Sequence, residues 1–203
     1  MIITNQEIKL PKPEFSGMMS LEESLYKRRT IRDYKNEPLT LQEVSQLLWS
    51  IQGITDLDWG LRTTPSAGAL YPLEIYIVVG NIKNLDPGIY KYHPQKHSLI
   101  KTLDGDKRKE LYTAALQQES IIQAPVNFVI AAIFQKTSIK YGSRAERYVW
   151  LEAGHAAQNL LLQATALNLG AVPIGAFYDN EVKETLRLQK EEEPLYIIPT
   201  GRK

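Results

Sequence analysis

The sequence predicts an α+β protein whose central sheet is mainly antiparallel and flanked by helices. Helical and strand patterns alternate irregularly along the 203 residues, two short strands follow one another as a hairpin, and no internal repeat is present. A doubly wound parallel sheet needs strands and helices in strict alternation, so this order favours α+β. A chain of this length can bury a full hydrophobic core.

The first 19 residues are extended and contain prolines, which indicates an arm over the surface or over a partner subunit. One domain is then expected to cover residues 20–203. Ser20 and Glu23 have the spacing of a capping box, in which the hydroxyl accepts from the glutamate's backbone amide and the carboxylate bonds back to the cap. A helix is therefore expected to run to about Arg29.

A second capping box, at Thr40 and Glu43, begins the next predicted helix. Its apolar residues follow the 3.6-residue period of a helix, and Gly53 ends the segment. The stretch from Thr63 to Pro72 has too many small residues and prolines for a core helix. It is expected to be a loop that leads into a strand at 74–80.

The middle of the chain predicts a β-hairpin, a helix and a buried strand. Residues 88–92 and 98–100 are the two arms of the hairpin. A helix is expected at 106–118. The apolar run at 126–134 predicts a central strand that is buried on both faces.

A long helix is expected from about Arg144 to Leu169, ended by Gly170. Its apolar residues lie on more than one side, which implies burial all round. His155 lies within it among small residues, and a buried, hydrogen-bonded histidine is a better interpretation than a proton donor. An extended piece, a short helix with Asp179 as its cap and a last strand follow, at 171–177, 179–188 and 195–199.

Composition excludes several classes of function. The net charge is +1, so no overall field attracts nucleic acid or an anionic membrane. There is no cysteine, which excludes disulfides, thiolate metal sites and a thiol nucleophile, so any redox chemistry must come from a bound organic cofactor. The N-terminus does not have the pattern of a signal peptide, and no apolar run is long enough to cross a bilayer. A cytoplasmic protein is expected.

Two cationic segments form a candidate anion site. Arg28, Arg29, Thr30 and Arg32 place three guanidinium groups and a hydroxyl within one or two turns of chain, and these donors match the oxygens of a phosphate dianion. The alternative is that basic residues at a helix end only complement the helix dipole. A second cationic segment at the chain end, with Arg202, favours the phosphate.

Two loops, at 65–72 and 173–179, have residues small enough for the backbone to approach a flat ligand closely. The alternative is that both are merely tight connections. No strand is followed by a Rossmann glycine fingerprint, and no Walker loop is present. A dinucleotide is therefore not expected to be held in a Rossmann domain.

Three other groups of residues have a functional and a structural interpretation. His93 and His97 suggest a metal pair, but the proline between them and the missing third ligand oppose it, so no metal site is expected. The run at 191–193 is interpreted as a solvated acidic turn. Lys140 and Tyr141 could transfer protons if their pKa values were lowered, but a surface pair is the commoner arrangement.

Five stretches together resemble the flavin-dependent nitroreductase superfamily, and most closely its thiazoline/oxazoline (azoline) dehydrogenase branch. The likeness covers about residue 20 to the C-terminus. It rests on the order and spacing of these stretches: 28–32 (Arg-Arg-Thr-Ile-Arg), 65–68 (Pro-Ser-Ala-Gly), 140–142 through 151–159, 172–177 (Val-Pro-Ile-Gly-Ala-Phe) and 201–202 (Gly-Arg).

The resemblance implies a nitroreductase-like fold and a homodimer with FMN sites at its interface and the long helix at its centre. The implied phosphate ligands are Arg28, Arg29, Thr30, Arg32 and Arg202. The implied ring-lining residues are Pro65, Ser66, Ala67 and Gly68, from the partner subunit, with Gly175 and Ala176. Lys140 and Tyr141 match a pair that is associated with catalysis in the azoline dehydrogenases.

The activity that the resemblance implies is hydride transfer between NADH or NADPH and a small nitroaromatic, quinone or enone. One alternative is an azoline-type dehydrogenase that passes electrons from its substrate through FMN to oxygen. Another is a flavin-binding module without turnover. Neither a nucleic acid nor a membrane is expected as a partner.

Overall fold

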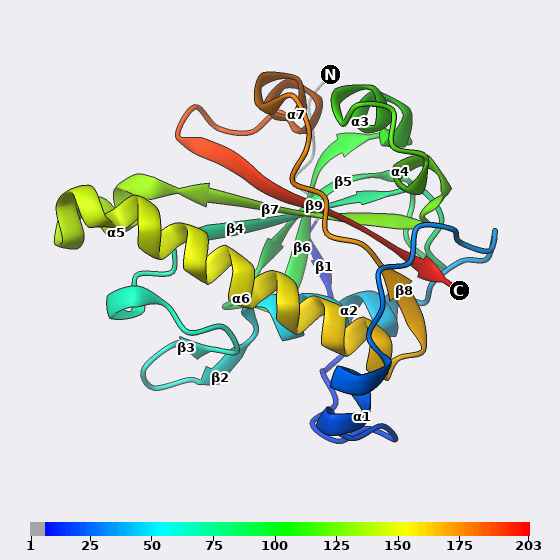
Figure 1. Cartoon of the computed structure of the whole chain (residues 1–203), viewed down its shortest axis with the longest axis horizontal. Helices are drawn as coiled ribbons and strands as arrows, with labels where there is room; N and C mark the ends of the chain where they lie inside the picture. The colour runs from blue at the N-terminus through cyan, green and yellow to red at the C-terminus, as the bar shows by residue number, and fades with distance from the viewer. Residues whose placement is uncertain (1–6) are drawn as a thin grey trace.

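The fold is built on one seven-stranded sheet with helices on both faces (Figure 1). The structure is a computed structural model that describes residues 7–203. The strand order is β1-β6-β5-β4-β7-β9-β8, and every neighbouring pair is antiparallel, which confirms the predicted fold class. The strands are β1 (Glu7–Lys9), β4 (Leu73–Val79), β5 (Gly88–His93), β6 (Ser98–Asp104), β7 (Val126–Ile133), β8 (Leu169–Ala171) and β9 (Glu192–Arg202).

The helices form a layer on each side of this sheet (Figure 1). Ile75 and Ile77 of β4 pack toward α2 (Leu41–Gln52) and α6 (Ala145–Ala166), whereas Tyr76 and Val78 pack toward α3 (Arg108–Ala114), α4 (Glu119–Gln123) and α7 (Asp179–Leu186). Successive residues of a strand point to opposite faces. The predicted central strand, β7, is buried on both faces, so that prediction is confirmed.

Both predicted capping boxes begin helices, but only one is complete. At α2 the Thr40 amide donates to the Glu43 carboxylate (2.8 Å) and the Glu43 amide donates to the Thr40 hydroxyl (3.2 Å), and the helix ends at Gly53 as expected. At α1 (Leu21–Lys27) Ser20 accepts from the Glu23 amide, but the Glu23 carboxylate pairs with Lys27 instead. This helix ends two residues earlier than predicted.

The described part of the N-terminal arm extends the sheet. β1 pairs with β6 as an edge strand, and residues 1–6 of the predicted arm lie outside the described residues. His97 Nε2 lies 2.7 Å from the Ser45 hydroxyl and 3.0 Å from the Pro11 carbonyl, so this histidine fastens the arm to α2. Within residues 7–203 no three histidine or acidic side chains gather as a metal site would require.

Two predicted helices have different bounds. The helix expected at 106–118 covers only α3 (Arg108–Ala114), because Leu116 and Gln117 adopt the left-handed conformation, with φ of 58° and 56°, and end it early. The short helix α4 follows beyond the expected segment and was not predicted. The long helix ends at Ala166, with Asn168 left-handed (φ 57°) after it. Gly170, expected as its end, lies in β8.

The sequence prediction missed α5 (Phe134–Tyr141), which is followed by a 3₁₀ turn at 142–144, and a small hairpin of β2 (Ile54–Asp56) and β3 (Leu61–Arg62). Within a single chain α6 is not buried on all sides, and its burial against a partner subunit stays a prediction. Trp150 and Leu151 are 50% and 53% exposed, and His155 is exposed rather than buried.

Within residues 7–203, no helix combines the length and the apolar character needed to span a bilayer.

Candidate functional site

The two cationic segments of the sequence meet in the fold. Thr30 forms a parallel bridge with Ala171 of β8, and the Ile31 amide donates to the Ala171 carbonyl (3.1 Å). Four residues later the Lys35 amide donates to the Arg202 carbonyl (3.0 Å). Figure 1 shows the segment after α1 running beside β8 toward the C-terminus. Backbone hydrogen bonds therefore place residues 28–32 next to the end of the chain.

Glycines make this approach possible. A Cβ on Gly170 would lie 2.7 Å from the Ile31 side chain, and a Cβ on Gly201 would lie 3.0 Å from the Tyr34 ring and 2.8 Å from Pro125. Real Cβ atoms do not come this close to packed neighbours, so only glycine fits. The Tyr34 hydroxyl also lies 2.8 Å from the Ile31 carbonyl and 2.9 Å from the Pro199 carbonyl, which fastens the segment to β9.

The charges of this segment are largely uncompensated. Arg28 is half-buried, whereas Arg29, Thr30 and Arg32 are exposed. None of these arginines takes part in an ion pair within residues 7–203. Arg29 donates to the carbonyls of Tyr26 and Arg28, which fits the helix-end role. Arg28, Thr30 and Arg32 remain open to an anion.

Arg202 already has a partner. Its two terminal nitrogens lie 2.7 and 3.0 Å from the carboxylate oxygens of Glu43, a bidentate pair. Glu43 also completes the capping box of α2. The capping pattern accounted for this glutamate in the sequence, so its ion pair with Arg202 was not predicted. A phosphate at Arg202 would have to share the guanidinium group with Glu43.

A second group of predicted residues meets at the other side of the chain, around Gly68. A Cβ on Gly68 would lie 2.9 Å from the Tyr141 hydroxyl and 3.0 Å from Lys140 Nζ, and its φ is +64°. Both side chains come from the last turn of α5. Tyr141 stacks edge-on against Tyr148 of α6, with 5.0 Å between ring centroids. The loop at 65–68 and the Lys140–Tyr141 pair therefore lie side by side.

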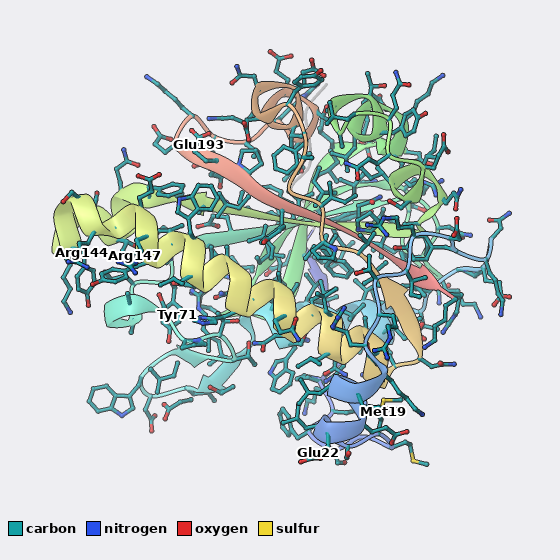
Figure 2. The ribbon with its side chains drawn as sticks, in the orientation of Figure 1. Met19, Glu22, Tyr71, Arg144, Arg147 and Glu193 are labelled. Carbon is teal, nitrogen blue, oxygen red and sulfur yellow. The ribbon has the colours of Figure 1, made fainter. Side chains whose placement is uncertain are left out.

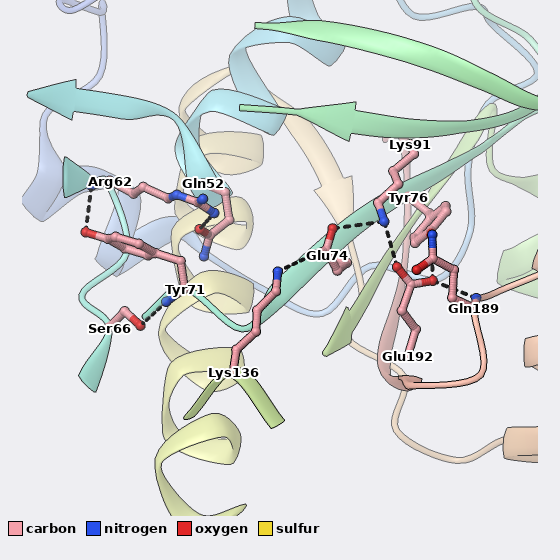
Figure 3. Close-up of polar contacts among 10 residues, drawn as sticks. All are labelled: Gln52, Arg62, Ser66, Tyr71, Glu74, Tyr76, Lys91, Lys136, Gln189 and Glu192. Atoms are coloured by element: carbon pink, nitrogen blue, oxygen red, sulfur yellow. Dashed lines mark hydrogen bonds and ion pairs between the residues drawn. The ribbon is translucent and has the colours of Figure 1, made fainter. Parts of the chain in front are cut away.

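A half-buried polar network supports this loop (Figure 3). The Tyr71 amide donates to the Ser66 hydroxyl (2.9 Å), which donates to the Glu152 carboxylate (2.6 Å). Arg62 donates to the Gln52 side chain (2.8 Å) and lies over the Tyr71 ring, 4.4 Å from its centroid. Glu152 was not among the predicted site residues. The available signal was a carboxylate followed by alanine and glycine in the middle of a long helix.

Glu152 is nearly inaccessible, with 3% of its surface exposed. Burial raises the pKa of its carboxyl to about 7, against the opposing effects of the Ser66 hydrogen bond and the Arg62 charge. Burial likewise lowers the pKa of Arg62. This carboxyl therefore changes its charge in the neutral pH range.

The predicted solvated acidic turn at 191–193 is wrong at its central residue. Glu192 is fully buried, 2.6 Å from Lys91 Nζ and 2.7 Å from the Tyr76 hydroxyl (Figure 3). Burial opposes its charge, but hydrogen bonds from Lys91 and Tyr76 outweigh it and lower its pKa. Glu74 bridges Lys91 (3.0 Å) and Lys136 (2.5 Å). A polar cavity of about 330 Å³ adjoins these ion pairs.

The second predicted loop, at 173–179, leaves room for a flat ligand. Gly175 and Ala176 are exposed, and a Cβ on Gly175 would meet only the Tyr196 ring, at 3.9 Å. The Ala176 carbonyl accepts from the Gln118 side chain (3.0 Å). Open space at this glycine, together with the uncompensated arginines, fits a ligand with a flat ring and a phosphate, as FMN has.

Within one chain these groups do not form a single site. The 28–32 segment lies beside β8, just beyond the C-terminal end of α6, whereas Ser66 contacts Glu152 in its N-terminal half. From Glu152 to the end of α6 at Ala166 the helix rises about 21 Å. Figure 2 shows Arg144 and Arg147 at one end of α6 and Met19 and Glu22 near the other. A ligand that contacts both groups therefore needs a second chain.

Comparisons with known proteins cover nearly all of the chain. The sequence model of the nitroreductase family matches residues 25–202. MJ1384 of Methanocaldococcus jannaschii, which is provisionally named a nitroreductase, is 48% identical over 197 residues, covering 97% of this chain and 96% of MJ1384. The microcin B17-processing protein McbC of Escherichia coli is 27% identical over 205 residues, covering 95% of this chain and 75% of McbC.

A solved structure has the same fold. A crystallised protein of Anabaena variabilis superposes with a TM-score of 0.86 at 32% sequence identity. The match covers 98% of this chain but 42% of the Anabaena chain, so the present chain spans less than half of that larger protein.

Proposed function

The chain belongs to the nitroreductase family, and from this premise we propose that it is an FMN-dependent oxidoreductase that transfers hydride between NADH or NADPH and a small organic acceptor. Nitroaromatics, quinones and enones are the proposed acceptors. The family is generally flavin-dependent. The choice of FMN rests on this chain's own residues. The predicted cytoplasmic location stays a prediction.

The observation that carries the proposal is the group of open donors at Arg28, Thr30 and Arg32. Charged donors without an ion-pair partner within residues 7–203 suit a dianion, because guanidinium groups bind phosphate oxygens in pairs. Arg202 would join them by sharing its charge between the phosphate and Glu43. Arg29 is proposed as an outer ligand, because its guanidinium already caps α1.

The ring of FMN is proposed to lie against the loops at 65–68 and 175–176. When bound, FMN supplies the hydride chemistry. The small residues of both loops would let the backbone lie flat against a ring, and the closeness of Lys140 and Tyr141 to Gly68 supports a position beside that ring. Their proposed role is to hold and transfer a proton at the Tyr141 hydroxyl and Lys140 Nζ.

We propose a homodimer in which one chain supplies the phosphate residues and its partner supplies the loop at 65–68. The distance along α6 between these groups supports it. So do large apolar side chains that are exposed near α1 and on α6, among them Phe15 (82%), Met18 (104%) and Leu151 (53%). A groove of about 820 Å³ lies between the arm, α2 and α6. Buried in a dimer, these surfaces would stabilise it.

A second candidate function is an azoline-type dehydrogenase that removes hydride and a proton from its substrate and passes the electrons to oxygen. The contact of Lys140 and Tyr141 with Gly68 favours it, because that chemistry needs a proton acceptor beside the flavin. Similarity to McbC, named for microcin B17 processing, points in the same direction.

The purified protein, or the protein mixed with FMN, is expected to show the yellow absorption of a bound flavin. NADH or NADPH is expected to bleach it, and a quinone to restore it, in repeated cycles. A colourless protein that binds no added FMN would overturn the proposal. A yellow protein that neither reductant bleaches would exclude NADH and NADPH as donors and would leave the azoline-type dehydrogenase and a flavin-binding module without turnover.

Arg28→Ala is expected to weaken FMN binding by about 2 kcal/mol or more, roughly 30-fold in Kd, because a charged hydrogen bond to the phosphate is lost. Fluorescence titration of the apoprotein with FMN measures it. Lys109→Ala is the control, since Lys109 is an exposed cation of α3 on the opposite face of the sheet. Near-normal affinity in Arg28→Ala would show that the phosphate lies elsewhere.

A further inference from the structure

The loop that follows Ser66 is held in an unfavourable backbone conformation. Gly68 has a φ of 64°, and two residues with side chains, Ala69 and Tyr71, have φ of 55° and 47°. Residues with a Cβ rarely adopt this region, because the Cβ crowds the neighbouring carbonyl oxygen. Such a conformation persists only where surrounding contacts hold it, and it is common at functional sites.

The contacts that hold this loop lead to Glu152. The Tyr71 amide donates to the Ser66 hydroxyl (2.9 Å), and the Ser66 hydroxyl donates to Glu152 Oε2 (2.6 Å). The Tyr71 ring is held from the other side by Arg62. The hydrogen-bond chain thus joins one strained residue of the loop to a carboxyl group on the long helix α6.

Glu152 is unusual among the carboxyl groups of the chain. It is 3% exposed, and its Oε1 has no hydrogen-bond partner within residues 7–203. The groups that face it are Arg62 of β3, Lys136 of α5, Gln52 of α2 and Ser66 of the loop. The Gln52 amide nitrogen, which has no other partner within residues 7–203, lies close enough to lower the pKa of this carboxyl. Oε1, which Ser66 does not contact, is the oxygen that can take up a proton.

We propose that Glu152 is a positioning residue which, through Ser66, holds the loop at 66–71 against Lys140 and Tyr141, and that its ionised form is the one that holds the loop. An ionised carboxylate accepts from the Ser66 hydroxyl more strongly than a neutral acid does. The Ser66 hydroxyl then donates to Glu152 and accepts from Tyr71 at once. Protonation weakens this chain and releases the strained loop.

The pKa of Glu152, about 7, places this change in the neutral range. Because the folded pKa lies above the value of 4.5 for a free glutamate, the folded chain binds the proton more tightly than the unfolded chain. Its contribution to stability is present below pH 4.5 and is lost as the pH rises to about 7. Global stability and local loop order are therefore expected to change in opposite directions, which a merely structural carboxyl would not cause.

Glu152→Gln and Ser66→Ala test the proposal on the flavin-free protein. Hydrogen exchange of the Tyr71 amide, corrected for intrinsic rates, is expected to be at least about tenfold faster at pH 8 in both variants than in the parent. Chemical denaturation measures the free energy of unfolding. In the parent it is expected to fall between pH 4.5 and 7, and in Glu152→Gln this fall should be absent. Glu146→Gln, the same change at an exposed position of α6, should match the parent in both measurements.

The consequence for turnover rests on the proposed function. In the FMN-loaded enzyme, kcat is expected to rise through an inflection near pH 7 that Glu152→Gln lacks. Unchanged exchange of the Tyr71 amide in both variants would overturn the positioning role, whatever the activity. Faster exchange of the Tyr71 amide with an unchanged pH profile of kcat would support the contact between Glu152 and the loop. It would count against the proposed role of Lys140 and Tyr141, because their position beside the loop would then not affect turnover.

Discussion

Replacing Lys140 with alanine and Tyr141 with phenylalanine in one chain is expected to slow turnover of the organic substrate by about 100- to 10,000-fold, the usual contribution of a positioned proton donor or acceptor. Both groups lie at Gly68, within the loop proposed to line the flavin. Stopped-flow absorbance separates the two half-reactions. Flavin reduction by NADH or NADPH is expected to continue, because hydride transfer from a nicotinamide does not need their proton.

The matched control is Gln135→Ala, an exposed residue of the same helix, α5, which should leave both half-reactions unchanged. The two candidate functions differ in the affected step. In a nitroreductase the loss falls on reoxidation by the acceptor, whereas in an azoline-type dehydrogenase it falls on flavin reduction by the substrate. Unchanged turnover of every accepted substrate would remove Lys140 and Tyr141 from the mechanism.

Glu192→Ala is expected to lower the free energy of unfolding by about 3 to 5 kcal/mol, because it leaves the half-buried ammonium of Lys91 without its nearest partner. It also leaves the buried Tyr76 hydroxyl without its acceptor. Urea denaturation at pH 7 measures the loss. Glu191→Ala, at the exposed neighbouring position, is the control and should change stability by less than about 0.5 kcal/mol.

The pH dependence gives a second measurement of the same interaction. The pKa of Glu192 lies below its ordinary value of 4.5, so its stabilising effect is present above pH 4.5 and is lost as the pH falls through the lowered pKa. The difference between the parent and Glu192→Ala should therefore shrink in acid. Equal losses in Glu191→Ala and Glu192→Ala would show that the run at 191–193 is solvated after all.

Local signals in the sequence predicted the elements correctly where residues close in the chain decide the structure. The capping box at Thr40 and Glu43 and the end at Gly53 predicted α2 to the residue. The apolar run that became β7 was predicted as a central strand, because a strand buried on both faces has no polar alternation. These features depend on contacts between residues close in the chain or on burial alone.

Local signals failed where a distant contact decided the structure. No glycine or proline marks the break between α3 and α4, where Leu116 and Gln117 turn left-handed. The start of α5 directly after β7 also has no cap, so it was missed. The burial of Glu192 depends on Lys91, which is 101 positions away in the chain. No pattern within the acidic run could distinguish its middle residue from its neighbours.

The sequence by itself determined the antiparallel α+β fold and the two capped helices, because these follow from periodicity and capping. It also supplied the residue types of the proposed phosphate site, from donor chemistry, and of the proposed flavin site, from the family resemblance. Tertiary structure decided which of these residues meet. It brought residues 28–32 to Arg202, placed Gly68 against Lys140 and Tyr141, and buried Glu152 under that loop. The physical reason is that the contacts between β8, β9 and the 28–32 segment, and between α5, α6 and the loop, join parts of the chain far apart in sequence. These contacts stabilise the protein only once the core has formed and has brought the distant segments together.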